Sequence, residues 1–239
     1  MLSLPEKYRK DTHIAKSTFI SGGNLAGAER KRFETSVEEI RIMYQIEGFD
    51  IPNLVNDEYN CQVIMFICIK LKDLKQAAFI AKVMQKCIVP LCVIEFTDGV
   101  NAQYSFADKR LNKQNEKEIV IENEYLTDKL PQNQQNDKKT LFTLYIDYET
   151  ILNRNNKHSY YLEMMTKAFL VFNQELFSGE LIDSRMWHDD NKVLRCYPLL
   201  KKLKALKLSA AKAKTVSEKS DLNRQIKSII KELEELIQL

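Results

Sequence analysis

The longest apolar run in the chain covers residues 61–71, where nine of eleven residues are apolar and four are Val or Ile. A strand with one solvent-exposed face alternates apolar and polar residues, and this run does not, which predicts a β-strand covered on both faces. A helical pattern follows from residue 73 to 86, and a second apolar run occupies residues 90–96. The order strand, helix, strand predicts a right-handed βαβ unit with two parallel strands.

The segments around this unit predict further strands. Residues 25–40 have helical spacing, residues 41–47 alternate in part as a strand, and residues 49–60 contain turn residues. Residues 102–106 follow the turn signal at residues 98–99 and should pair antiparallel with the strand before them, because a short turn cannot carry a parallel crossover. A loop is expected at 109–117 and another strand at 118–125. The fold class predicted is α/β, with a mixed sheet that contains a βαβ unit.

The second half of the chain has helical spacing throughout. Two helices are expected after residue 140, with a break near 153–158, followed by a lysine-rich helix at 192–213. Thr215 and Glu218 have the spacing of a capping box that begins a last helix. Residues 131–139 are polar and predict a linker, so the expected division is a mixed α/β domain at 1–130 and a helical region at 140–239.

The last helix carries an apolar stripe with the four-three spacing of a short coiled coil. Two heptads are marginal alone, so the stripe must be buried against another surface. An intramolecular hairpin and an interface with a partner or a second copy both stay open. The stripe consists of Leu222, Ile226, Ile229, Leu233 and Leu236.

Composition limits the class of protein. The chain has 239 residues, is 44% apolar and carries a formal charge of +3, so it can fill a core and is not coated with basic charge. No segment has the length of a membrane span or the apolar region of a signal peptide, which predicts a soluble cytoplasmic protein with no membrane partner. The cysteines form no CxxC pair, and core positions in a reducing compartment are expected for Cys61, Cys68, Cys87, Cys92 and Cys196.

Two groups of basic or polar residues are candidate phosphate contacts. One lies at the carboxyl end of the central strand, where α/β sheets bind ligands. The other lies in the predicted loop at 109–117, where an arginine can bind a phosphate through two hydrogen bonds. The lysine-rich helix is a third basic feature, which either follows a nucleic-acid backbone or forms the solvated side of a helix. The first two groups comprise Lys70, Lys72, Lys109, Arg110, Asn112 and Lys113.

A strand followed by lysine also suggests nucleases of the PD-(D/E)xK type, in which carboxylates hold Mg²⁺ and a lysine assists the attacking water. The position two before Lys72 is Lys70, and the position two before Lys70 is Cys68, so neither lysine has the required carboxylate. The chain has no phosphate-binding glycine loop, no GxSxG and no HExxH motif. No catalytic residue, metal ligand or cofactor is therefore predicted, and a divergent nuclease is the enzymatic alternative.

Several short segments, in this order, resemble a bacterial family of unknown function. Genes of that family lie beside helicase and DNA methyltransferase genes in restriction-like phage-defence clusters, so the resemblance implies a setting more than a mechanism. It covers about residues 1–130 and rests on Leu4-Pro5, Ile14-Ala-Lys16, Phe19, Ile69-Lys-Leu-Lys72, Ile88-Val-Pro90, Phe106-Ala-Asp-Lys-Arg-Leu-Asn112 and Ile119-Val-Ile-Glu122.

The function expected from these features is that of a non-catalytic accessory subunit of an anti-phage defence complex. It would bind a larger helicase or nuclease subunit through its helical region and would contact DNA through basic residues. A stand-alone coiled-coil interaction protein, with a homo-oligomer formed through the last helix, is the second alternative.

Overall fold

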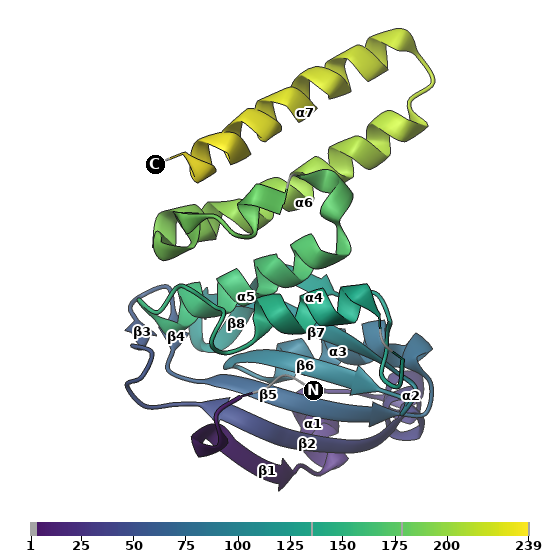
Figure 1. Cartoon of the computed structure of the whole chain (residues 1–239). Helices are drawn as coiled ribbons and strands as arrows, with labels where there is room; N and C mark the ends of the chain where they lie inside the picture. Colours follow the sequence, from purple (N-terminus) through teal and green to yellow (C-terminus); the bar gives the residue numbers. More distant parts are fainter. Residues whose placement is uncertain (1–3, 135, 178, 239) are drawn as a thin grey trace.

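The computed structural model describes residues 4–134, 136–177 and 179–238. In this part of the chain the main sheet has seven strands in the order β1-β2-β5-β6-β7-β8, with the short β9 paired to β7. Helices cover both faces of the sheet, and the last two helices form a further layer above one of them (Figure 1). The chain therefore has an α/β fold with a mixed sheet and a helical C-terminal end, as its residue pattern predicts.

The predicted βαβ unit is at the centre of the sheet. Strand β5 (Ile64–Leu71) pairs in parallel with β6 (Leu91–Thr97), and they are joined by the turn η2 (Leu74–Gln76) and helix α3 (Ala77–Cys87). Ile67 and Ile69 face a core shared with α3, whereas Ile64 and Phe66 face the core on the other side. Burial on both faces explains why this segment lacks polar alternation.

The chain before β5 differs from prediction. Strand β1 (Arg9–His13) and helix α1 (Lys16–Gly22) were not expected, and the helix predicted for 25–40 is shorter, because α2 spans Gly27–Ser36 and β2 begins at once as Val37–Ile46. A bulge between Val37 and Glu39 lets Val37 and Ile40 point to the same core, although they are three residues apart. That spacing imitates a helix, so the prediction of helix to residue 40 was wrong.

The segment after β6 forms a long hairpin. Strand β7 (Asn101–Asn112) pairs antiparallel with β6 and with β8 (Asn115–Leu126), and β9 (Leu130–Pro131) pairs with the start of β7. The antiparallel pairing with β6 confirms the prediction, but the loop predicted for 109–117 was wrong. Lys109 and Arg110 are strand residues, and the turn is confined to residues 113–114. Two further strands, β3 (Leu54–Val55) and β4 (Asn60–Cys61), form a separate small ladder.

Helices α4 (Asp137–Ile146) and α5 (Lys157–Phe172) cover the face of the sheet opposite to α1–α3. The connection between them contains the predicted break. Glu163 in α5 accepts hydrogen bonds from the backbone N–H of Leu152 (2.9 Å) and Asn153 (2.6 Å) and forms a buried ion pair with Lys167 at 2.6 Å. Sheet residues before the predicted 131–139 linker and helical residues after it share one hydrophobic core.

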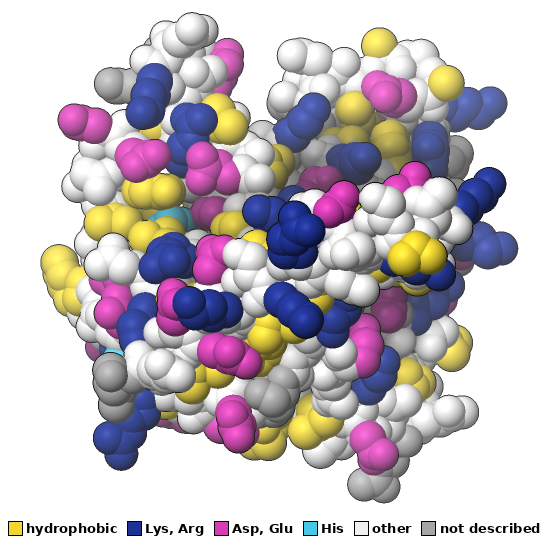
Figure 2. All heavy atoms as spheres, turned by 90° about the horizontal axis from the view of Figure 1, so that it is seen from above, with side chains coloured by type: hydrophobic (Ala, Val, Ile, Leu, Met, Phe, Trp, Pro, Cys, Tyr) yellow, Lys and Arg dark blue, Asp and Glu magenta, His cyan; other side chains and the backbone are white. Residues whose placement is uncertain are grey.

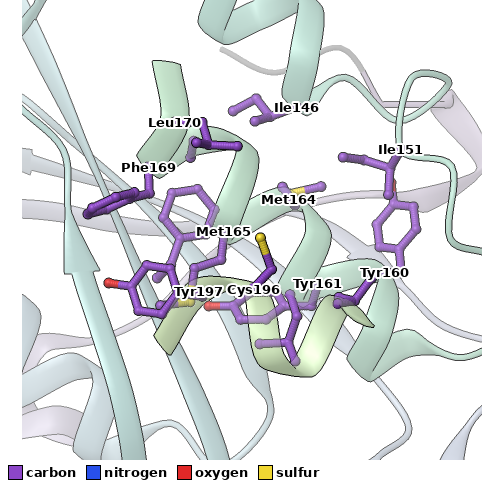
Figure 3. Close-up of a cluster of buried hydrophobic side chains, with 14 of the residues drawn as sticks. Ile146, Ile151, Tyr160, Tyr161, Met164, Met165, Phe169, Leu170, Cys196 and Tyr197 are labelled. Atoms are coloured by element: carbon purple, nitrogen blue, oxygen red, sulfur yellow. The ribbon is translucent and has the colours of Figure 1, made fainter. Parts of the chain in front are cut away.

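The last two helices form an antiparallel hairpin that packs on α5. Helix α6 (Asp190–Lys212) contacts α5 through the rings of Tyr197 and Phe169, whose centroids lie 5.4 Å apart, and Figure 3 shows both side chains in the buried cluster. Helix α7 (Val216–Ile237) begins at the predicted capping box of Thr215 and Glu218. None of the described helices has the length and apolarity needed to cross a bilayer.

Candidate nucleic-acid and partner interface

Lys109, a predicted phosphate contact, lies inside the protein with 4% of its surface exposed. Its Nζ donates hydrogen bonds to the carbonyl oxygens of Ile88 at 2.6 Å and Pro90 at 3.1 Å, and it lies 3.5 Å from the Sγ of Cys92. Burial lowers the pKa of the Lys109 amine. The amine satisfies two carbonyl groups in the loop before β6, so it has no access to a phosphate on the surface.

The other predicted contacts of this hairpin are on the surface, but most are paired. Arg110 donates from Nε to Glu122 at 2.6 Å, and the amide of Asn112 donates to Glu118 at 3.3 Å. Lys113 is exposed in the turn. The carboxylate of Glu122 thus neutralises Arg110 and that of Glu118 lies beside Asn112, which makes this strand pair a poor anion site.

The lysines at the end of β5 are also separate from the hairpin. Lys70 forms an ion pair with Glu38 at 3.0 Å, and Lys72 lies exposed one residue beyond the strand. The predicted residues therefore do not converge on one site.

The apolar stripe of the last helix packs within the chain. Ile229, Leu233 and Leu236 are at most 3% exposed, while Leu222 and Ile226, nearer the hairpin tip, are partly exposed. α7 packs along α6, and the amine of Lys192 in α6 donates to the carbonyl of Gln238 at 3.0 Å. In this structure the intramolecular hairpin, one of the two arrangements left open by the sequence, covers the buried half of the stripe.

The strongest concentration of charge in the chain is on this α6–α7 hairpin. Residues 192–231, defined here as the basic arm, contain twelve Lys or Arg and two Asp or Glu, a net +10 against +3 for the whole protein. The remainder of the chain is therefore acidic. Figure 2, which views the molecule from the side of α7, shows Lys and Arg side chains spread across this face.

Many charges of the basic arm are free. Among the described residues, the ion pairs of the arm are the exposed ones of Arg224 with Asp221 (3.5 Å) and Lys231 with Glu235 (3.8 Å). A few lysines reach backbone groups, such as Lys207 to the carbonyl of Leu176. The exposed cations of the arm with neither an ion pair nor a hydrogen bond in the described structure are Arg195, Lys202, Lys212, Lys214, Lys219 and Lys227.

One face of α7 consists almost entirely of hydrogen-bond donors. Lys219, Ser220, Asn223, Arg224 and Lys227 line a shallow groove of about 520 Å³ together with Val216 at its end. These five residues, the α7 donor stripe, span about 12 Å at 1.5 Å per helical residue. Lys, Arg, Ser and Asn are the side chains that commonly donate to phosphate oxygens.

A buried carboxyl group was missed in the sequence analysis. Glu95 on β6 is 7% exposed, lies opposite Cys68 of β5 and borders a cavity of about 20 Å³ beside Phe66 and Tyr104. Burial raises the pKa of Glu95, while hydrogen bonds from Tyr104 and Gln132 oppose that rise. The cavity has room for about one water molecule. The sequence does contain a signal for this group, because Glu95 is the one acidic residue inside the apolar run of residues 91–96.

Other titratable groups form structural contacts. His158 at the start of α5 is 2.9 Å from the carboxylate of Asp108 and stacks against Tyr59, and both members of the pair are buried. Asp190 accepts hydrogen bonds from the amides of Asn153 and Asn155 and so joins the start of α6 to the α4–α5 connection. In the described parts of the chain, no three His, Cys, Asp or Glu residues are grouped so that they could hold a metal ion.

The fold and these surfaces define a mixed-sheet α/β protein with a basic helical hairpin. The chain belongs to the family described as domain of unknown function DUF4391, whose model matches residues 2–233. The match includes the sheet and the whole basic arm. No curated protein and no solved structure shows a significant match.

Proposed function

We propose that the protein is a non-catalytic accessory subunit of a DNA-directed anti-phage defence complex. Its basic arm contacts the phosphate backbone of DNA, and its α/β body binds a larger helicase, nuclease or methyltransferase subunit. The observation that carries the proposal is the net +10 of residues 192–231, with six exposed cations that have no partner in the described chain. The resemblance of the N-terminal segments to a family encoded in defence clusters supports the assignment to an anti-phage defence complex.

The side chains of the arm favour double-stranded over single-stranded DNA. No aromatic residue follows Tyr197 in the sequence, and Tyr197 itself is buried. Proteins that hold single strands stack the bases on aromatic rings, whereas contacts to a duplex backbone need only charges and hydrogen-bond donors. The arm therefore fits a duplex and binds it without a strong preference for sequence.

The test is binding of the full-length protein to a fluorescent DNA duplex, followed by anisotropy at several salt concentrations. Five or six phosphate contacts give a slope of log K against log salt of about −5, because each contact contributes about −0.9. The triple variant Lys219→Ala, Arg224→Ala, Lys227→Ala should make the slope less negative by about 3.

A matched control removes Lys31, Lys75 and Lys82, which are exposed cations of α2, η2 and α3. This Lys-to-Ala triple lowers the net charge equally and should leave the slope within about one unit of the wild-type value. Equal changes of the salt slope in the two triple variants would reject a defined contact surface on the arm. Cleavage of the duplex in Mg²⁺ would favour the nuclease alternative.

A further inference from the structure

The first half of β8 is an open sheet edge. β8 is the last strand in the sheet order, and among the described strands it pairs with β7 alone. Its later residues are covered by α6, since the hydroxyl of Tyr197 donates to the carbonyl of Glu124 at 3.0 Å and Lys201 reaches the side chain of Asn123 at 3.5 Å. No backbone group from another described segment bonds the outer side of residues 118–122. Alternate N–H and C=O groups there are left for an added strand.

A groove runs beside this open edge. It has a volume of about 530 Å³ and lies where the end of α3 meets β8. Its apolar lining comes from Cys87, Val89, Ile119 and Ile121, and its charged lining from Lys86 and Glu118. Val89 is 47% exposed, and both isoleucines are partly exposed. The isoleucines are two residues apart and point to the same side, so they offer the alternate positions that side chains of an added strand would meet.

Carboxylates flank these isoleucines. Glu118 and Glu122 are exposed at the two ends of residues 118–122, and Glu118 also lines the groove. Arg110 partly neutralises Glu122, and Glu118 accepts from the amides of Asn112 and Asn115. Each carboxylate has room for further hydrogen bonds, because an ionised carboxylate accepts about four.

This charge pattern identifies the occupant. If a second copy of the chain paired antiparallel through β8 about Val120, Glu118 of one copy would lie opposite Glu122 of the other, and like charges directly opposite are destabilising. A segment in which apolar residues alternate with Lys or Arg matches both the isoleucines of the groove and the carboxylates that flank them. Main-chain hydrogen bonds would supply affinity and the alternating side chains specificity.

We propose that residues 118–122 of β8 bind an extended segment of a partner protein, in which apolar residues alternate with Lys or Arg, as an additional strand of the sheet. This docking site belongs to the α/β body and deepens the proposed function by defining the partner's binding motif. It is separate from the basic arm, so a failed duplex-binding test leaves it standing, and its own failure leaves the arm's DNA contact standing.

The experiment uses the ¹⁵N-labelled full-length protein and two capped peptides, one alternating lysine with valine and one alternating glutamate with valine. With the lysine peptide, amide hydrogen exchange should slow at those residues of 118–122 whose N–H groups point away from β7. The glutamate peptide should bind about tenfold more weakly, which corresponds to about 1.4 kcal/mol.

The variant Glu118→Lys with Glu122→Lys should reverse this preference while its urea midpoint stays close to that of the wild type. Reversal is a readout that general loss of structure would not give, and the wild-type exchange data stand even if the variant does not fold. Absence of protection with both peptides would overturn the proposal. A wild-type dimer in sedimentation that Val120→Pro disrupts would also overturn it, in favour of pairing between copies.

Discussion

Replacement of Lys109 separates a structural role from a phosphate-binding role. Its amine is the hydrogen-bond donor to the carbonyl oxygens of Ile88 and Pro90 at 2.6 and 3.1 Å. Lys109→Met keeps the aliphatic stem but leaves these two acceptors without this donor, and each buried unsatisfied group costs about 1–3 kcal/mol. Since the variant no longer has to bury an amine, the expected net loss of unfolding free energy is about 2–4 kcal/mol.

The assay is urea unfolding of the full-length protein at neutral pH, together with duplex binding under conditions where the variant is folded. Lys113→Ala, at an exposed turn position four residues later, is the control and should change stability by no more than about 0.5 kcal/mol. DNA affinity of the folded Lys109→Met protein should equal that of the wild type. Wild-type stability combined with weakened DNA binding would refute the reasoning, because it would place the amine on the surface.

Two further predictions concern buried groups. Burial raises the folded-state pKa of Glu95 above its ordinary value of 4.5, so the wild type should lose stability as pH rises from about that value through the raised one. Glu95→Gln should remove this loss when urea unfolding is measured at a series of pH values, and identical pH profiles of the two proteins would contradict the prediction. Leu233 of α7 is fully buried in the packing against α6, so Leu233→Asp should lower the free energy of unfolding by about 3–5 kcal/mol. It should also expose α7 to limited proteolysis while the sheet stays protected, and unchanged protease resistance of α7 would contradict the packing.

The hydrophobic pattern of the chain predicts the centre of the fold because each element there is buried in a regular way. Two-sided burial of β5 and β6 gives continuous apolar runs, and the stripe on α3 gives helical spacing. The start of β2 could not be predicted in the same way. Its bulge places Val37 and Ile40 on one side, and a three-residue spacing in a strand cannot be told from a helical turn by pattern alone.

The site was harder to predict because charge in a sequence does not reveal burial. Lys109 occupies an inward position of β7, where the backbone carbonyls of Ile88 and Pro90 satisfy its amine, so its charge made the end of this strand resemble a loop. In contrast, the lysines of α6 and α7 are visible in the sequence, and only the structure shows which of them are unpaired. The edge of β8 is a property of strand order and has no local signature.

The central claim is that the basic arm, and not the β7–β8 hairpin, touches DNA. The most direct measurement introduces a photoreactive amino acid at Ser220 in the α7 donor stripe or at Lys113 in the hairpin turn, both exposed, and irradiates each full-length protein with a labelled duplex. Efficient crosslinking from position 220 that salt suppresses, with little from position 113, is the predicted result. Crosslinking from position 113 alone would contradict the account.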